Sequence, residues 1–276
     1  MHLRHPRSIA SDLNAHAPDL WQPPARVILP PMKHLADGAR ALGVSLTDDQ
    51  IESFQAYYEM LIAWNTRMNL TQITGYQEVQ VKHFLDSLSC VAALQDTGGQ
   101  VDWGAGGEPR VLDLGTGAGF PGLPLKIAFP VLRLTLLEAI GKKARFLQAL
   151  VDQLGLTGVQ VLNARAEEAG HDPAHRQAYD LVLARSVAKM PILAELTLPL
   201  VRIGGLVIAQ KGKDPSPEVE TAHNAIKIAG GRVRQILPVT VPGLRGARHL
   251  VVLDKASATP DQYPRRPGIP AKRPLQ

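Results

Sequence analysis

The sequence predicts a doubly wound α/β fold: a seven-stranded, mostly parallel sheet with an N-terminal helical extension. Between residues 110 and 255, apolar runs of strand length alternate with segments of helical periodicity, which is typical of parallel strands joined by crossover helices. A glycine-rich turn, GTGAGFPG, follows the first apolar run, at the point where doubly wound sheets bind their ligands. The last two runs have no helix between them, so we expect them to pair antiparallel.

The chain before the sheet divides into an N-terminal extension and a helical region. Residues 1–31 are rich in His and Pro and lack periodicity, which predicts disorder. In the predicted helical segment, residues 32–95, Thr47 and Gln50 have the spacing of a capping box, so a helix should begin there. Apolar residues follow the cap at helical spacing: Ile51, Phe54, Tyr58, Leu61 and Ile62. Residues 64–74 predict a polar turn, and residues 78–94 predict a second amphipathic helix.

The predicted core domain, residues 110–255, follows a Gly-rich connector at residues 96–109. Its strands are expected at residues 111–114, 134–137, 159–162, 181–184, 206–210, 232–237 and 249–253. Helices are expected at residues 121–129, 142–154, 191–201 and 218–229. Helices between successive strands should cover both faces of the sheet.

Composition narrows the class of protein. With 276 residues, 45% of them hydrophobic, the chain is long enough for one sizeable core. The single cysteine, Cys90, excludes a disulfide within the chain and fits a reducing compartment. No apolar stretch has the length of a membrane span or the pattern of a signal peptide, so we expect a cytoplasmic protein.

The formal net charge of +5 is concentrated in a basic, Pro-rich tail at residues 256–276 and the lysine before it. From residue 255 onward Asp261 is the single acid, and the cations are Lys255, Arg265, Arg266, Lys272 and Arg273. Prolines at positions 264, 267, 270 and 274 are expected to prevent a helix and leave an extended segment that orders on RNA. The alternative is a solvated terminus that favours solubility.

The glycine turn indicates the kind of ligand. The dinucleotide fingerprint G-x-G-x-x-G requires glycine at position 120, where this chain has Phe120, so a nicotinamide dehydrogenase is disfavoured. Gly115, Gly117 and Gly119, preceded by Asp113, instead resemble the first motif of S-adenosylmethionine-dependent methyltransferases. The next predicted strand ends at Glu138, where an acid can accept both ribose hydroxyls of an adenosine.

Two later strand ends carry further candidates. Ala166 and Glu167 follow the third strand, where backbone amides and a carboxylate could meet an adenine edge; an ordinary acidic helix start is the alternative. Arg185 directly follows the fourth strand, on the side of the transferred methyl. This cation is either functional or pairs with a carboxylate.

The acceptor of the methyl group is narrowed by elimination. Methylation of exocyclic base amines usually uses Asn or Asp followed by two prolines after the fourth strand, and this chain has ARSVAKMP. Carbon-5 methylation of pyrimidines needs a cysteine nucleophile, but Cys90 lies in an apolar helix typical of a packed thiol. Guanine N7 has a free lone pair and loses no proton, so positioning alone could supply most of the acceleration.

Five ordered motifs, NLTQIT, HFLDSLS, GTGAGFPGLPLKI, LLEAIGKKARFL and RHLVVL, resemble the family of ribosomal small subunit methyltransferase G, also called glucose-inhibited division protein B. The resemblance implies a class I S-adenosyl-L-methionine-dependent fold and methyl transfer to guanine N7 in bacterial 16S rRNA. Residues 1–31 and the loop at 103–107 are additional to the family pattern. The tail YPRRPGIPAKRPL resembles tails of some members.

The motifs and the resemblance together give the predicted site. Cofactor contacts are expected at Asp113, Gly115, Gly117, Gly119, Phe120, Glu138, Ala166, Glu167 and Arg185, with Glu138 replacing the aspartate of some relatives. Arg185 is also the catalytic candidate. Substrate contacts are expected at Asn69, His83, Asp86, Ser87, Arg265, Arg266, Lys272 and Arg273. His83 and Asp86 share a helix face, so they form either a structural hydrogen bond or part of a base pocket.

The expected partner is 16S rRNA or the small ribosomal subunit, with no metal, no membrane and no obligate protein partner. The alternative is a non-catalytic RNA-binding protein with a vestigial nucleotide pocket. The intact residues Gly115, Gly117, Gly119 and Glu138 argue against such decay.

Overall fold

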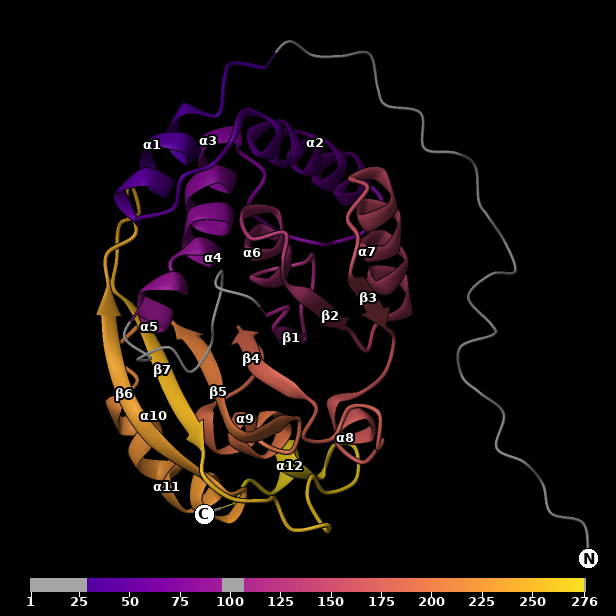
Figure 1. Cartoon of the computed structure of the whole chain (residues 1–276), viewed down its shortest axis with the longest axis vertical. Coiled ribbons are helices and arrows are strands. Elements are labelled where there is room, and N and C mark those ends of the chain that lie inside the picture. Colours follow the sequence, from indigo (N-terminus) through magenta and orange to yellow (C-terminus); the bar gives the residue numbers. More distant parts are fainter. Residues whose placement is uncertain (1–28, 96–106, 276) are drawn as a thin grey trace, which may run out of the picture. The chain divides into compact units, whose positions relative to one another are not determined.

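The computed structural model describes residues 29–95 and 107–275 (Figure 1). The compact body begins at Met32. The predicted disorder of residues 1–31 lies almost wholly outside the described residues, as does most of the predicted connector. No helix in the described ranges has both the length and the apolar character needed to cross a membrane.

A seven-stranded sheet is the centre of the described chain, in the order β3-β2-β1-β4-β5-β7-β6. The first five strands are parallel, and β7 pairs antiparallel with both β5 and β6. The strands are β1 Arg110–Leu114, β2 Arg133–Leu137, β3 Val159–Leu162, β4 Tyr179–Arg185, β5 Val201–Lys211, β6 Gly231–Val239 and β7 Arg248–Lys255. The predicted class I methyltransferase fold is confirmed, including the antiparallel pairing of the last two strands. The strand order reverses between β1 and β4, which is where such sheets bind ligands.

The helices divide between two hydrophobic clusters on opposite faces of the sheet (Figure 1). Val111 of β1 belongs to one cluster and Leu112 to the other, as the alternation of side chains along a strand requires. α6 Gly122–Ala128 and α7 Gly141–Gln153 pack on the first face together with the N-terminal helices. The second face carries α9 Met190–Thr197, α10 Ser216–Thr221 and α11 His223–Ile228.

The N-terminal helices are α1 Lys33–Ala41, α2 Asp48–Asn65, α3 Tyr76–Val79, α4 Asp86–Leu88 and α5 Val91–Gln95. The predicted capping box is confirmed, because Thr47 Oγ1 accepts from Gln50 N at 3.3 Å and Gln50 Oε1 accepts from Thr47 N at 2.9 Å. The apolar face of α2 is turned slightly from the prediction: Tyr57 is fully buried, whereas Tyr58 is only half-buried. The predicted continuous helix at 78–94 is wrong, since a π-helical segment, Gln80–Leu85, interrupts it and it divides again after α4.

The C-terminal tail is ordered against the body, so the prediction of an extended, unattached segment is wrong. Residues 269–272 form a short helix, α12 Ile269–Lys272. Pro270 lies in its first turn, where the missing N–H would have no helical partner in any case. Arg265 donates to the buried Glu195, and Pro264 and Pro270 are buried, so contacts with the body outweigh the extended preference of a proline-rich segment.

Candidate functional site

The glycine turn follows β1, and its three glycines have different structural causes. Gly115, Gly117 and Gly119 all have positive φ, at 66°, 62° and 101°. A Cβ at Gly115 would lie 2.9 Å from Val187 Cγ2, and one at Gly119 would lie 2.5 Å from Tyr57 Oη. A Cβ at Gly117 would meet nothing nearer than the Gly115 carbonyl oxygen at 4.0 Å. Protein packing therefore requires the outer two glycines, and the turn is open at Gly117, where a ligand could approach its backbone.

Glu138, directly after β2, joins this turn to the neighbouring strand. Its carboxylate is buried, with Oε2 accepting from Gly117 N at 3.0 Å and Oε1 accepting from Ile140 N at 2.8 Å. A carboxylate has about four acceptor positions, and these bonds use two of them. The structure thus brings together two sequence-predicted residues and leaves Glu138 with acceptor capacity beside the open side of the turn.

Asp113 lies beneath the turn and is fully buried. Its Oδ2 accepts from Thr116 Oγ1 at 2.5 Å and from Gly122 N at 2.8 Å, so it ties the turn to the start of α6. Burial raises the pKa of Asp113 to about 6, although both hydrogen bonds act in the opposite direction. No described residue pairs with the other oxygen, Oδ1. The position of Asp113 supports the turn from below.

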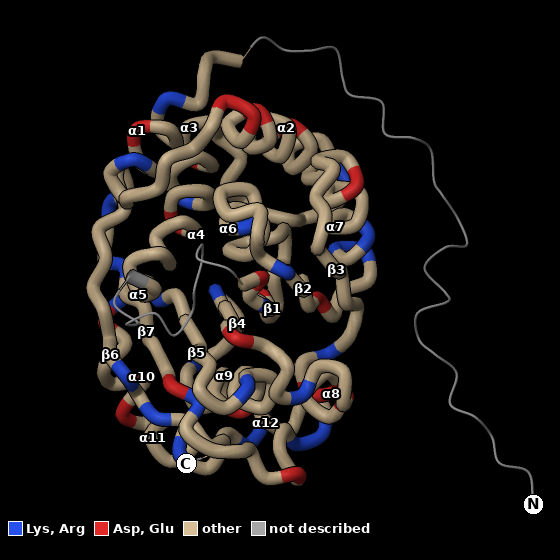
Figure 2. The backbone as a smooth tube through the Cα atoms, viewed as in Figure 1, with Lys and Arg blue, Asp and Glu red and all other residues tan. Residues whose placement is uncertain are grey.

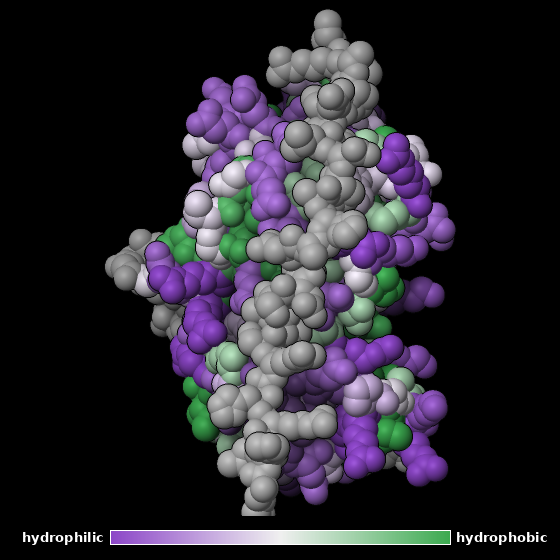
Figure 3. Space-filling model, turned by 90° about the vertical axis from the view of Figure 1, so that its right-hand side faces the viewer, coloured by the Kyte–Doolittle hydropathy of each residue, from purple (hydrophilic) through white to green (hydrophobic). Residues whose placement is uncertain are grey.

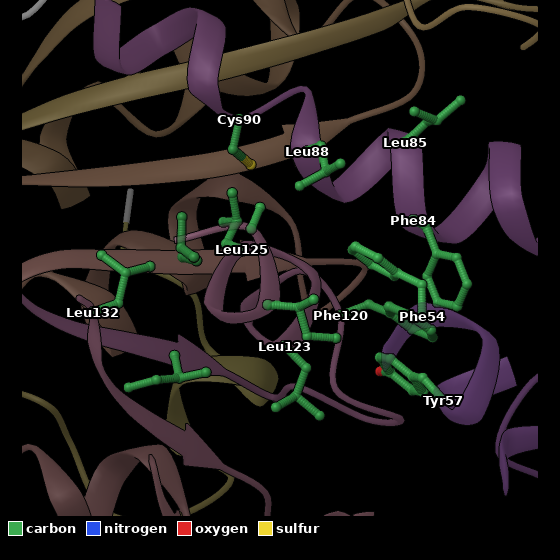
Figure 4. Packing of buried hydrophobic residues seen from close by; sticks show 14 of the residues in the cluster. Phe54, Tyr57, Phe84, Leu85, Leu88, Cys90, Phe120, Leu123, Leu125 and Leu132 are labelled. Carbon is green, nitrogen blue, oxygen red and sulfur yellow. The ribbon is translucent and has the colours of Figure 1, made fainter. Parts of the chain in front are cut away.

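The N-terminal helices hold the far side of the same turn. Tyr57 of α2 donates its hydroxyl to the Ala118 carbonyl at 2.5 Å, and its ring stacks on Phe120 with centroids 5.4 Å apart. His83 stacks on Phe120 as well, at 4.4 Å. Figure 4 shows Phe120 packed among aromatic residues of these helices. The Phe120 side chain, predicted as a cofactor contact, is therefore a core residue that anchors the turn. Tyr57 was missed, and its only signal is its spacing of three from Phe54.

Arg185, at the end of β4, pairs with a carboxylate, which is one of the two alternatives that the sequence allowed. Its Nη1 donates to Asp86 Oδ2 at 2.9 Å, and its Nη2 donates to His83 Nδ1 at 2.9 Å. The guanidinium carbon lies 5.1 Å from the centroid of the Phe120 ring. Arg248, which sequence reasoning missed although it begins the motif RHLVVL, donates to Asp86 Oδ1 at 2.7 Å. Asp86 thus binds two arginines from different strands.

The hydrogen bonds of His83 define its protonation. An arginine can only donate, so Nδ1 accepts and the ring hydrogen lies on Nε2, which donates to Thr71 Oγ1 at 2.8 Å. Burial, followed by the charge of Arg185, lowers the pKa of His83 to about 3. His83 is therefore neutral near pH 7, and both of its nitrogens are engaged. Ser87 is buried and donates to the His83 carbonyl at 2.6 Å, whereas Asn69 is exposed in the turn after α2.

The remaining predicted residues lie at α8 Ala166–Ala169 and in the tail. Glu167 is buried, and its Oε1 accepts from Gly268 N of the tail at 3.0 Å. Arg265 is bound to Glu195, whereas Arg266, Lys272 and Arg273 are exposed. Figure 2 shows several Lys and Arg positions around α8, α9 and α12. The structure therefore brings the tail to α8, a proximity that the sequence did not predict.

The arrangement suits binding and positioning. The Gly117 turn follows β1, Glu138 follows β2 and α8 follows β3, whereas Arg185 is the last residue of β4. All four therefore lie at the carboxyl edge of the parallel strands. Cys90 is buried, and burial raises its pKa, so this thiol is a core residue. Among the described residues, no group of three or more His, Cys, Asp or Glu side chains is arranged to hold a metal ion.

Comparison with known proteins gives a consistent set of matches. The family model GidB, described as rRNA small subunit methyltransferase G, matches residues 50–251. A relative from Dehalococcoides mccartyi (strain BAV1), named Ribosomal RNA small subunit methyltransferase G, is 51% identical over 88% of this chain and 100% of its own length. Relatives of the same name from Roseiflexus sp. (strain RS-1) and Alkaliphilus metalliredigens are 48% and 42% identical, again over 88% of this chain and over 100% and 98% of their own lengths.

Proposed function

The chain belongs to the GidB family of rRNA small subunit methyltransferase G, and from this membership we propose that it methylates N7 of a guanine in 16S rRNA. The methyl donor is S-adenosyl-L-methionine. The observation that carries the proposal is the turn at Gly117, whose N–H is held by Glu138 and whose open side would be filled by any side chain larger than hydrogen. These residues fit a donor with ribose hydroxyls that needs close approach to the backbone.

The residues at the carboxyl edge would each bind a different part of the methyl donor. The turn at Gly115–Gly119 would hold the methionine part, Glu138 would accept from the ribose hydroxyls, and Ala166 and Glu167 would meet the adenine. The bound donor supplies an activated methyl group on a sulfonium. Asp113 supports the turn, and Phe120 does so through its packing against Tyr57 and His83.

The proposed chemistry needs no general base, because the lone pair of guanine N7 is free and no proton leaves. This agrees with a neutral His83 whose two nitrogens are already engaged. Arg185 stands at the end of β4 with its guanidinium fixed by Asp86. In that position it orients the guanine or its phosphate for in-line attack on the methyl, which is the role we assign to it.

For the RNA surface we propose the exposed cations Arg266, Lys272 and Arg273, together with Asn69. Arg265 is left out, because its guanidinium is bound to the buried Glu195. The side of the molecule that carries α7, β3 and α8 is largely hydrophilic where it is visible (Figure 3), which suits a charged partner rather than an apolar one. A ribosomal RNA substrate would place the protein in the cytoplasm.

The test is a comparison of 16S rRNA from cells with and without the gene, mapped for 7-methylguanosine. One modified guanine should be present only when the gene is intact. Identical maps would reject the proposal. A thermal shift with S-adenosylmethionine separates the enzyme from an RNA-binding protein with a vestigial pocket, which would show none. A shift with NAD instead would favour a dehydrogenase.

A further inference from the structure

The C-terminal segment, residues 256–275, which we term the strap, is fixed to the body by a buried charge pair. The Glu195 side chain in α9 has no exposed surface. It accepts three hydrogen bonds from Arg265: from the backbone N at 2.8 Å, from Nε at 2.9 Å and from Nη2 at 2.6 Å. Because a buried carboxylate without a cation is costly, this pair ties the strap to one position.

A second set of contacts holds the strap against the residues after α8. Arg176 donates to the carbonyls of Thr259 and Tyr263, each at 2.8 Å, and to the carbonyl of Gly170 at 2.7 Å. A Cβ at Gly170 would lie 2.7 Å from two carbons of the Pro264 ring, so the close approach requires glycine there. The strap is therefore built into the fold beside α8.

From this position the strap reaches Glu167. The N–H of Gly268 donates to Glu167 Oε1 at 3.0 Å. Within the described parts of the chain, no residue donates to the other oxygen, Oε2. This oxygen is not one of the fully buried side-chain atoms that lack a partner. The carboxylate thus has one oxygen held by the strap and one free to accept from a ligand.

We propose that the strap is a positioning element that sets the preference of the site for adenine. By holding Oε1, Gly268 fixes the Glu167 carboxylate so that Oε2 accepts from the 6-amino group of the adenine. A carboxylate fixed in this way repels a 6-oxo base, so the contact discriminates as well as binds. The inference rests on the proposed function, since it assigns the adenine end of the donor to α8.

A strap that only stabilised the fold would weaken every ligand of the site alike. A strap that acts through Glu167 would change the ratio between two ligands that differ in the 6-substituent of the purine and in the proton that the 6-oxo form carries on N1. S-adenosylhomocysteine and S-inosylhomocysteine are such a pair, carrying a 6-amino and a 6-oxo group. The ratio of their dissociation constants is therefore the informative readout.

The experiment measures both dissociation constants by calorimetry on the full chain and on Arg265→Ala, with Arg266→Ala as the matched control. The wild type should prefer the adenosyl compound by about ten- to a hundredfold, the range for a hydrogen bond to a charged group. Arg265→Ala should lose most of this preference. Arg266→Ala removes an equal charge from an exposed strap position, so it should keep the preference while binding RNA more weakly.

Two further variants test whether the strap acts through Glu167 even if Arg265→Ala fails to fold. If Arg265→Ala leaves Glu195 buried without a cation and does not fold, Glu195→Gln combined with Arg265→Ala removes that charge and still lacks the ion pair that fixes the strap. Glu167→Ala should abolish the preference by itself, and adding Arg265→Ala should then change it no further, because the strap acts through Glu167.

The outcomes distinguish the inference from the function on which it rests. A wild type that binds neither compound would reject the proposed function and the inference together. A wild type that binds both equally, or a strap-released variant that keeps the wild-type preference, would overturn the inference alone. Loss of the preference in Arg265→Ala, but not in Arg266→Ala, supports it.

Discussion

Replacing Tyr57 by phenylalanine tests whether the N-terminal helices support the cofactor turn. The Tyr57 hydroxyl donates to the Ala118 carbonyl at 2.5 Å, and the Tyr57 side chain is fully buried. Burial raises the pKa of Tyr57, so the hydroxyl keeps its proton and remains a donor throughout the usable pH range. Tyr57→Phe removes this one donor and keeps the ring that stacks on Phe120.

The magnitude follows from what the substitution leaves behind. The Ala118 carbonyl loses a buried hydrogen bond without gaining access to water, which costs about 1–3 kcal/mol of unfolding free energy. The turn also carries Gly117, whose N–H is bound by Glu138, so a displaced turn should weaken S-adenosylmethionine binding several-fold. Stability and affinity should therefore fall together.

The assay is urea denaturation with calorimetry, and Tyr58→Phe is the matched control. The Tyr58 hydroxyl donates to the Thr74 carbonyl at 3.2 Å in an exposed setting, so its removal should cost less than about 0.5 kcal/mol and leave cofactor affinity unchanged. Equal effects of the two substitutions on stability, or an unchanged cofactor affinity in Tyr57→Phe, would refute the idea that α2 holds the turn.

Four further outcomes are expected. Gly117→Val should abolish S-adenosylmethionine binding; a Cβ there meets no protein atom nearer than 4.0 Å, so the cost to the fold is limited to the strain of a valine at the positive φ of 62°, and calorimetry and circular dichroism check both. Glu138→Ala should weaken cofactor binding by about 1.5–3 kcal/mol, and Glu138→Gln should recover part of this loss. If Glu138→Ala binds the cofactor as tightly as the wild type, Glu138 serves only to hold the Gly117 N–H. Arg185→Ala should lower the single-turnover rate more than RNA affinity, and an unchanged rate with saturating ligands would make Arg185 purely structural. The pKa of His83 is lowered from 6.5 to about 3, so the unfolded chain binds that proton more readily than the folded chain. The contribution of neutral His83 to the unfolding free energy is therefore fully present above pH 6.5 and falls by about 4 kcal/mol toward pH 3. Denaturation curves of His83→Phe should lack this dependence on pH.

The sequence predicts those parts of the fold that depend on local pattern. The apolar runs locate all seven strands, the central ones because a strand buried on both faces must be apolar throughout, and the capping box places the start of α2 at Thr47. The same local signal cannot show the π-helical segment at Gln80–Leu85, which retains apolar residues at nearly helical spacing. The amphipathic start of the body, α1, was also not predicted.

The parts that were not predicted depend on contacts between distant residues. Tyr57 and Ala118 are 61 positions apart, and Asp86 and Arg248 are 162 apart, so no local pattern indicates either pair. The tail is the clearest example, because its prolines and cations favour an extended segment when considered alone. The conformation is decided instead by Glu195, 70 positions earlier, which is buried in α9 and accepts Arg265.

The most direct test of the account is methyl transfer in a purified reaction. The wild type and Gly117→Val are incubated with radiolabelled S-adenosylmethionine and small ribosomal subunits from cells that lack the gene, and the labelled nucleoside is then identified. Label is expected in 7-methylguanosine of 16S rRNA with the wild type, and none is expected with Gly117→Val. Label in any other nucleoside, or equal labelling by Gly117→Val, would contradict the proposed function.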